Sequence, residues 1–279
     1  MAASGTTLVI GATGTTGSRV TAGLVAGGHR VRAAGRRAPA VDGAEAVRFD
    51  WEDPSTFGEA LAGTDRVYLV PPPGAPEPEA VMVPFLRQAR AAGVRRAVLL
   101  SSSAIPAGGP AAGQVHRALP GLFGEWAVLR PSWFMQNFTG GHHHARTIRD
   151  RGTIETATGD GRVAFVDADD IAAVAVHALT DAEAPDTDLV ITGPEALDHG
   201  EVAALLTEIT GRTVTHRRLS HDQVRERLAA SMPAGFAALL AGLDLAIAGG
   251  AEDRTTDTVQ RLTGRPPRDF RTFAEHEIT

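Results

Sequence analysis

The sequence has no cysteine and no lysine, and its single tyrosine is Tyr68. All 27 basic residues are therefore arginines. The lack of cysteine excludes disulfides, thiolate nucleophiles and zinc sites with sulfur ligands. The lack of lysine excludes a Schiff-base lysine, a phosphate-loop lysine and a Tyr-x-x-x-Lys proton donor.

Long apolar runs and an excess of basic charge are also missing. No run approaches the roughly 18 apolar residues that span a membrane. The first apolar run begins by Thr7, so we expect no signal peptide and no membrane partner. The net charge of −6 disfavours nucleic acid as a partner. The 279 residues, 43% of them hydrophobic, suffice for one large or two small domains of a protein that we predict to be cytoplasmic.

Three glycines, Gly11, Gly14 and Gly17, follow the apolar run Leu8–Ile10. The run is typical of a buried strand and the apolar spacing after Gly17 is helical, so the glycines are predicted at a strand-to-helix turn. Glycine lets an anion approach the main chain there, and the N–H groups of the new helix point at it. The first two glycines are one residue further apart than in the G-x-G-x-x-G fingerprint. The pattern therefore indicates either a phosphate site or a tight packing turn.

Short apolar runs alternate with helix-like segments over the first two thirds of the chain. The predicted strands are Arg30–Ala34, Ala46–Phe49, Arg66–Val70, Ala97–Leu100 and Trp126–Leu129, and Glu79–Gly93 is a predicted helix. This alternation predicts an α/β fold with a Rossmann-type, doubly wound parallel sheet, which binds ligands beyond the carboxyl ends of its strands. The alternation stops near Gly193. We therefore predict an NAD(P)-binding domain at 1–193 and a smaller, mostly helical substrate lobe at 194–279.

Arginines stand where an NAD-binding site would place a carboxylate. About 20 residues beyond the glycines, after the second predicted strand, the chain has Arg36 and Arg37. Two guanidinium groups suit a 2′-phosphate and predict a preference for NADPH, with solvated surface arginines as the alternative. After the third predicted strand, Asp50 and Trp51 are candidates to bind and cover the adenine. Asp53 is a candidate helix cap before a proline.

Residues after the next two predicted strands extend the cofactor site. Val70, Pro71 and Pro72 begin a proline-rich stretch that cannot continue a strand or a helix. They are predicted to line the cofactor cleft, or to serve only as a linker. The hydroxyl groups of Ser101 and Ser102 follow the predicted strand Ala97–Leu100, near the expected place of the nicotinamide.

Several linked motifs make the chain resemble a known family. The segments "GATGTTG", "LRPSWFMQNF" and "VAFVDADDIAAVAVHAL" resemble the NmrA-like branch of the atypical short-chain dehydrogenases/reductases. "VYLVPPP", "TIRDRGTI" and "GRPPRDF" are most similar to its ergot-alkaloid reductases, the agroclavine and festuclavine dehydrogenase group. The resemblance extends to about Phe273. It implies an NADPH-dependent reductase with a Rossmann-type domain and a smaller C-terminal lobe.

The resemblance also assigns residues by position. It places on the pyrophosphate Gly11, Thr13, Gly14, Thr15, Thr16 and Gly17. It places Arg36 near the 2′-phosphate, and Ser101 and Ser102 beside the nicotinamide. On the wall between cofactor and substrate it places Pro131, Trp133, Phe134 and Asn137. Asp169 and Asp170 are expected to cap the helix that follows them.

The chain departs from ordinary short-chain dehydrogenases at the proton donor. The helix that would carry tyrosine and lysine reads "GQVHRAL", with neither residue. His116 is the nearest titratable group and Ser102 lies beside the expected nicotinamide, so both are candidate catalytic residues. The alternative for His116 is local packing or hydrogen bonding.

A missing proton donor favours an acceptor that needs only hydride. An iminium ion is such an acceptor, and quinones or enones can take a proton from water afterwards. The rings of Trp133, Phe134 and Phe138 suit a small, flat, apolar acceptor, although one or two of them can equally be core residues. Two other functions stay open, a non-catalytic NADP(H)-binding sensor and a non-redox cyclase or isomerase on the same fold.

Two further segments are ambiguous in the sequence. The adjacent histidines His142, His143 and His144 do not share a helix face and lack a nearby carboxylate at ligand spacing, so we predict a surface or substrate-edge loop and no metal. Ala234–Gly250 is short on charge and is predicted to be a helix that closes over the substrate pocket. A packing helix or the face of a homodimer is the alternative.

Overall fold

The computed structural model describes residues 5–230 and 232–278. They form two compact units. The first unit runs through Arg130 and includes Ile171–Val190, and the second comprises Pro131–Asp170 and the chain from Ile191. The chain enters the second unit for the last time after Val190, close to the predicted domain boundary at 193, but residues 131–170 also belong to the second unit.

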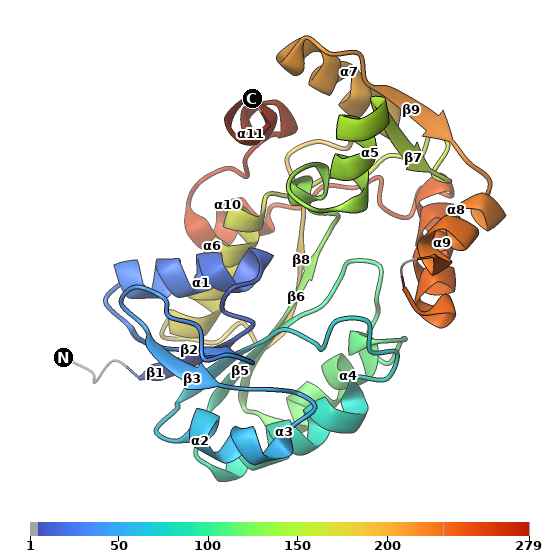
Figure 1. Cartoon of the computed structure of the whole chain (residues 1–279). Helices are drawn as coiled ribbons and strands as arrows, with labels where there is room; N and C mark the ends of the chain where they lie inside the picture. The colour runs from blue at the N-terminus through green and yellow to red at the C-terminus, as the bar shows by residue number, and fades with distance from the viewer. Residues whose placement is uncertain (1–4, 231, 279) are drawn as a thin grey trace. The chain divides into compact units, whose positions relative to one another are not determined.

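The first unit is built on a seven-stranded sheet with the order β3-β2-β1-β4-β5-β6-β8 (Figure 1). Its strands are β1 (Thr6–Ile10), β2 (Arg30–Gly35), β3 (Glu45–Arg48), β4 (Arg66–Leu69), β5 (Arg96–Leu100), β6 (Glu125–Pro131) and β8 (Thr187–Ile191). The pairs from β3 through to β6 are parallel. This order reverses at β1, as in doubly wound nucleotide-binding folds, and confirms the predicted architecture.

Helices cover both faces of this sheet. They are α1 (Thr15–Ala26), the 3₁₀ turn η1 (Pro54–Thr56), α2 (Phe57–Leu61), α3 (Glu79–Ala91), α4 (Ala112–Leu122) and α6 (Ala168–Thr180). In Figure 1, α1 lies on one side of the sheet and α2, α3 and α4 lie on the other. A core of apolar strand residues and the rings of Phe49, Phe57 and Phe85 fills the space between them. Burial of these faces supplies most of the stability of the unit.

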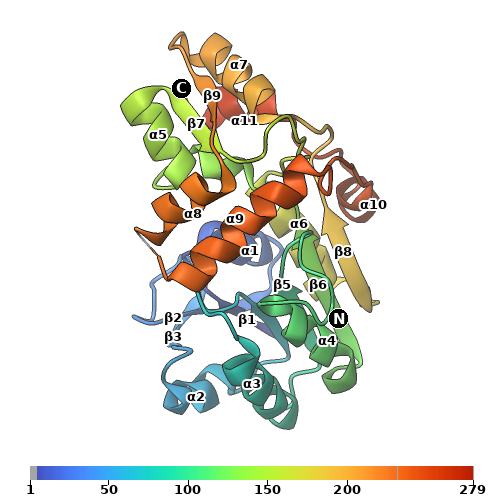
Figure 2. The ribbon, with the colours of Figure 1, turned by 90° about the vertical axis from the view of Figure 1, so that its right-hand side faces the viewer.

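The second unit is mostly helical. It holds the parallel pair β7 (Thr153–Thr156) and β9 (Thr215–Arg218). Its helices are η2 (Met135–Phe138), α5 (His143–Arg151), α7 (His199–Thr210), α8 (His221–Ala229), α9 (Ala234–Ala248), α10 (Thr258–Thr263) and α11 (Phe270–Glu277). Figure 2 shows α8 lying beside α9. Asp198 and Ser220 form capping boxes that begin α7 and α8.

Buried acidic residues lie at the start of α6. The Asp167 carboxylate is fully buried and accepts from the Asp169 main-chain N–H, so Asp167 caps this helix. Asp169 and Asp170, the predicted caps, lie instead in its first turn. Arg265 pairs with Asp170, and Arg268 pairs with Asp167.

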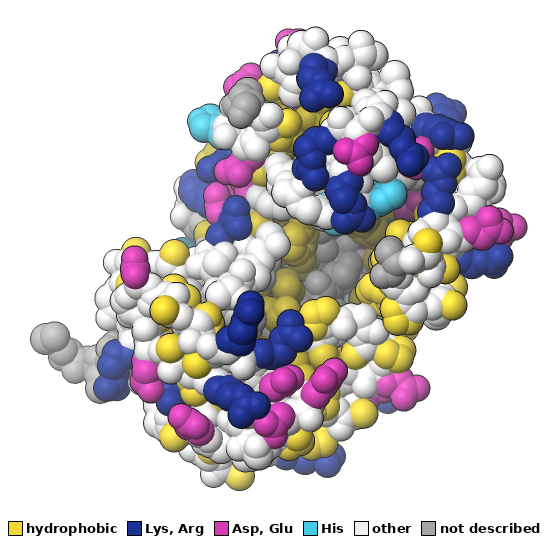
Figure 3. All heavy atoms as spheres, viewed as in Figure 1, with side chains coloured by type: hydrophobic (Ala, Val, Ile, Leu, Met, Phe, Trp, Pro, Cys, Tyr) yellow, Lys and Arg dark blue, Asp and Glu magenta, His cyan; other side chains and the backbone are white. Residues whose placement is uncertain are grey.

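None of the helices in residues 5–230 and 232–278 is long and apolar enough to span a membrane. Figure 3 shows acidic side chains among the arginines on the face of each unit that it presents. The visible surface therefore carries both signs of charge.

Candidate functional site

The glycine turn after β1 has the geometry of an anion cradle. Gly11 has a φ of 74°, which favours glycine, and the Gly14 N–H donates to the Gly11 carbonyl at 2.8 Å. A Cβ on Gly17 would lie 2.1 Å from that same carbonyl oxygen. The turn connects β1 directly to α1, as the sequence predicts, and two of its three glycines are sterically required.

The N-terminus of α1 is open to a ligand. Thr13, Gly14 and Thr15 are exposed, no side chain that the structure describes caps the helix, and its first turn carries no acidic residue. Thr16 is buried, and its hydroxyl accepts from the Tyr68 hydroxyl at 2.9 Å. The free N–H groups and the positive end of the helix dipole therefore favour a phosphate there.

The loop after β2 runs beside the glycine turn. The Gly11 N–H donates to the Ala34 carbonyl at 3.1 Å, and β2 ends one residue later. Arg36 and Arg37 are exposed on that loop, and none of the described residues pairs with their guanidinium groups. Two cations without ion-pair partners in the described part of the chain thus stand next to the anion cradle in the same unit.

The other predicted adenine and loop residues lie in the same unit. The Trp51 indole N–H donates to the Val70 carbonyl at 3.1 Å, and its ring packs edge-on against Phe49. The Asp50 carboxylate accepts from the Glu52 N–H, which leaves acceptor capacity for a ligand. Asp53 caps η1, as the sequence predicts. Val70, followed by Pro71 and Pro72, packs 3.5 Å from the position that a Cβ on Gly11 would take.

Polar groups gather beyond the end of β5. The hydroxyl of Ser101 is buried without a hydrogen-bond partner among the described residues, and the Ser102 hydroxyl accepts from the Ala104 N–H. His116 lies on α4 and is only 6% exposed, and burial lowers the pKa of its imidazole. The imidazole is therefore neutral near pH 7. Its Nδ1 has no partner in the described part of the chain.

The second unit contains a cavity of about 390 Å³. Trp133 and Asn137, two of the four predicted substrate residues, line it. Phe134 is not among its lining residues, and Phe138 is 3% exposed within the core, stacked on the His144 ring and edge-on to Phe165. Pro131 is buried at the end of β6. Of the predicted aromatic rings, that of Trp133 faces the cavity.

The three consecutive histidines also line this cavity. His142 precedes α5, and its ring accepts from the His144 N–H, while His143 and His144 form the first turn. Burial and the neighbouring imidazoles lower the pKa of His144 well below its usual range. Within the described residues no cluster of histidines and carboxylates has a geometry that would hold a metal ion. The cavity wall therefore presents neutral imidazoles near pH 7.

Sequence reasoning missed the charged residues of this cavity. Glu155 on β7, Arg227 on α8 and Asp244 on α9 all line it. The Glu155 side chain is 1% exposed and pairs with Arg227 and Arg217. The sequence does distinguish Asp244, because it is the sole charged residue in the apolar segment that forms α9. That helix also supplies Leu240 and Leu243 to the wall, which agrees with the predicted helix over the pocket.

His199 makes the stability of the second unit depend on pH. It is 2% exposed between Thr158, Phe165 and His216, and burial followed by the His216 charge lowers its pKa to about 3. Because the ordinary pKa is 6.5, protons then bind the unfolded chain more tightly. His199 therefore does not lower the free energy of unfolding above pH 6.5. Below pH 6.5 this free energy falls by about 1.4 kcal/mol per pH unit as the pH drops towards 3.

We expect urea midpoints to fall from pH 7.5 to pH 5 in the wild type and to fall less in His199→Gln. The raised pKa values of Asp170 and Asp244 act in the opposite direction but are common to both proteins. The difference between the two proteins therefore isolates His199. Equal slopes would show that His199 is protonated at no cost to the fold.

Comparisons with known proteins agree with this geometry. Residues 11–182 match a family described as NAD(P)H-binding. The uncharacterized oxidoreductase YesF of Bacillus subtilis is 43% identical over 96% of this chain and 93% of its own length. Festuclavine synthase II of Penicillium roqueforti is 39% identical over 98% of each chain. The NADPH complex of the Escherichia coli quinone oxidoreductase QOR2 superposes with a TM-score of 0.80 at 23% identity, over 97% of this chain and 99% of that one, and shows the shared fold. The relatives confirm the predicted resemblance.

Proposed function

Because this chain belongs to the family of NAD(P)H-binding oxidoreductases, we propose that it uses NADPH to reduce a small, flat, apolar acceptor. An imine or iminium ion is the first choice, and a quinone or enone is the second. The observation that carries this choice is the cavity of the second unit, which offers the Trp133 ring and neutral imidazoles, in a chain without the Tyr-x-x-x-Lys donor.

The first unit fits the cofactor. Its glycine turn leaves the close approach that a pyrophosphate needs, and the Ser101 hydroxyl is a buried polar group without a partner among the described residues. We assign the nicotinamide to Ser101 and Ser102, and the pyrophosphate to Gly11, Thr13, Gly14, Thr15, Thr16 and Gly17. NADPH supplies hydride, while the protein orients the acceptor and excludes water.

Turnover tests this proposal. The purified protein is titrated with NADPH by fluorescence, and nicotinamide absorbance is then followed with a panel of cyclic imines, iminium salts and quinones. We expect steady consumption of NADPH with at least one cyclic imine or iminium. NADPH binding with every acceptor inert would favour the non-catalytic sensor, and conversion of a substrate without loss of NADPH would favour a cyclase or isomerase.

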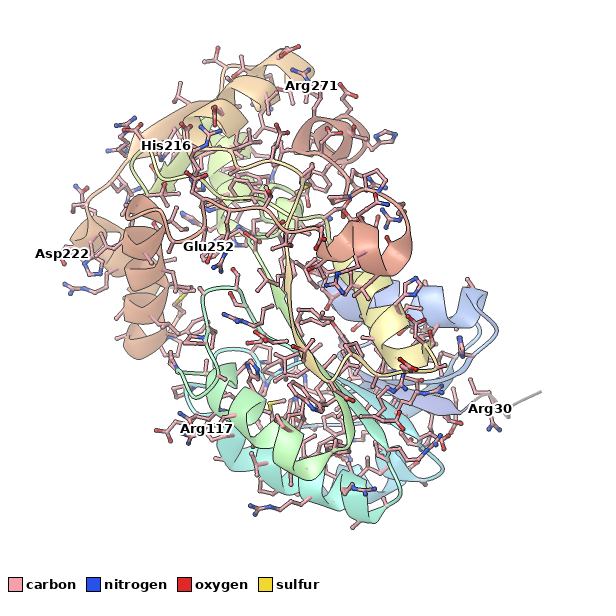
Figure 4. All side chains as sticks on the ribbon, turned by 180° about the vertical axis from the view of Figure 1, so that it is seen from behind. Arg30, Arg117, His216, Asp222, Glu252 and Arg271 are labelled. Atoms are coloured by element: carbon pink, nitrogen blue, oxygen red, sulfur yellow. The ribbon has the colours of Figure 1, made fainter. Side chains whose placement is uncertain are left out.

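Arg36 and Arg37 are expected to set the cofactor preference. Replacing both with alanine removes two guanidinium partners of the 2′-phosphate, so NADPH affinity should fall by about tenfold to 100-fold while NADH affinity stays constant. Arg30→Ala, an exposed arginine at the opposite end of β2 (Figure 4), is the matched control. Equal NADPH and NADH affinities in the wild type would refute the preference.

His116 remains the candidate proton donor for acceptors that need one. If it donates, His116→Gln should lower kcat for a quinone by about 10² to 10⁴ and flatten the pH profile. Because burial lowers the pKa of His116, the rate should decline as the pH rises through a value below 6.5. A variant with the wild-type rate and profile would restrict His116 to packing beside Trp126.

A further inference from the structure

Asp244 is an unusual residue for its helix. The other fourteen residues of the fifteen-residue helix α9 are uncharged, and most of them are alanine, leucine or glycine. Leu240 and Leu243 line the cavity together with Asp244, so the carboxylate belongs to an otherwise apolar stretch of wall. Burial raises the pKa of this carboxyl, with the Ala157 hydrogen bond and the His221 charge acting against the rise. Such placement costs folding energy, which suggests a role in binding.

The two carboxylates of the cavity differ in their partners. Glu155 is surrounded by Arg151, Arg217 and Arg227, so its charge is neutralised within the protein. Among the described residues, Asp244 accepts one hydrogen bond, from the Ala157 N–H at 2.8 Å to its Oδ2. In the described ranges, 5–230 and 232–278, no arginine forms an ion pair with it. The second oxygen therefore keeps acceptor capacity towards a ligand.

The other charged groups of the wall do not supply the missing cation. Arg227 pairs with Glu155, and Arg146 donates back to the Gly141 carbonyl at 2.7 Å. The imidazoles of His142 and His144 are neutral near pH 7, because burial lowers their pKa values. A carboxylate without an ion-pair partner among the described residues and an indole ring line the same cavity. Together they complement a flat organic cation, through an ion pair and a cation–π contact.

We propose that Asp244 is the counter-ion for a positively charged nitrogen of the substrate and thereby selects iminium ions over neutral acceptors. This inference rests on the proposed reductase function and names the residue that determines its substrate class. Hydride addition to the iminium carbon converts the C=N⁺ bond into a neutral amine and NADPH into NADP⁺. No proton donor is required, in agreement with the lack of the tyrosine and lysine pair.

Binding of a matched pair of ligands tests the role of Asp244 separately from turnover. N-methylisoquinolinium, a permanent flat cation, and neutral isoquinoline are titrated calorimetrically near pH 8 into the NADP⁺-loaded protein. We expect the wild type to prefer the cation by about tenfold and Asp244→Asn to lose that preference. Asparagine keeps an acceptor for the Ala157 N–H, and Asp244→Glu, which keeps the charge, should restore part of the preference.

Asp222→Asn is the matched control, because it removes the same charge from an exposed side chain on α8 outside the cavity wall (Figure 4). It should retain the wild-type preference. An unchanged preference in Asp244→Asn, equal binding of both ligands by the wild type, or no binding of either would overturn the inference. Failure of the proposed function gives a different result, since the Asp244-dependent preference would persist without oxidation of NADPH by a cyclic iminium salt.

Discussion

Gly17→Ala is expected to lower NADPH affinity by about 100-fold. The new Cβ would lie 2.1 Å from the Gly11 carbonyl oxygen and 3.2 Å from the Ala12 Cα. Both contacts are with main-chain atoms, so no side chain can rotate away, and the turn must open. The N–H groups of α1 then no longer converge on one phosphate position. Overpacking of this kind also lowers the free energy of unfolding by about 1 to 3 kcal/mol.

A second variant separates loss of the cradle from loss of the fold. Thr15→Glu places a carboxylate in the exposed first turn of α1, where negative charge stabilises a helix. The fold should persist, but the carboxylate repels the pyrophosphate and NADPH binding should fall strongly. Gly58→Ala is the control, because α2 has open space around this glycine and alanine favours the helix.

Fluorescence titration with NADPH and circular dichroism measure both effects. We expect reduced affinity with native spectra in Thr15→Glu, and wild-type affinity in Gly58→Ala. Wild-type NADPH affinity in both Gly17→Ala and Thr15→Glu would mean that the glycine turn serves only to pack α1 on the sheet. The cofactor would then have to be held elsewhere.

The sequence predicted those features of the first unit that have local causes. A short apolar run, three spaced glycines and helical spacing after Gly17 all act within a few residues, and the structure has β1, the turn and α1 there. Asp53 before Pro54 is a local capping signal, and it caps η1. Parallel pairing then follows from the alternation of strands and helices.

The second unit was less predictable, because its contacts join distant segments. Phe138 packs on Phe165 and Phe270, which lie far along the chain, so its burial is not visible in the local sequence. The same applies to Glu155, whose partners Arg217 and Arg227 come from β9 and α8. The predicted roles of cofactor and substrate residues stay predictions until binding is measured.

Arg268→Ala should produce the second large effect, a loss of stability in the second unit. Arg268 donates to the fully buried Asp167 carboxylate at 2.7 Å, and its main-chain N–H donates to Asp170 at 2.8 Å. Alanine keeps the main-chain bond but leaves a buried carboxylate without its cation. The free energy of unfolding should fall by about 2 to 3 kcal/mol.

The effect should reach the cavity, because Asp167 also holds the turn that carries Asn137. The Gln136 amide donates to Asp167 at 2.8 Å and accepts from the Ala168 N–H at 3.0 Å. Gln136 belongs to η2, whose next residue, Asn137, lines the cavity. We therefore expect a raised KM for the acceptor and unchanged NADPH affinity.

Arg271→Ala distinguishes this mechanism from a general loss of charge. Arg271 lies three residues after Arg268 and forms a bidentate ion pair with Glu208, but both side chains are exposed (Figure 4). Exposed pairs lose little when broken, because water solvates the partner that remains. The urea midpoint and KM of Arg271→Ala should therefore match those of the wild type. If the two variants instead behave alike, the buried Asp167 carboxylate does not depend on Arg268, and its bonds from Asp169 and Gln136 are sufficient to hold it.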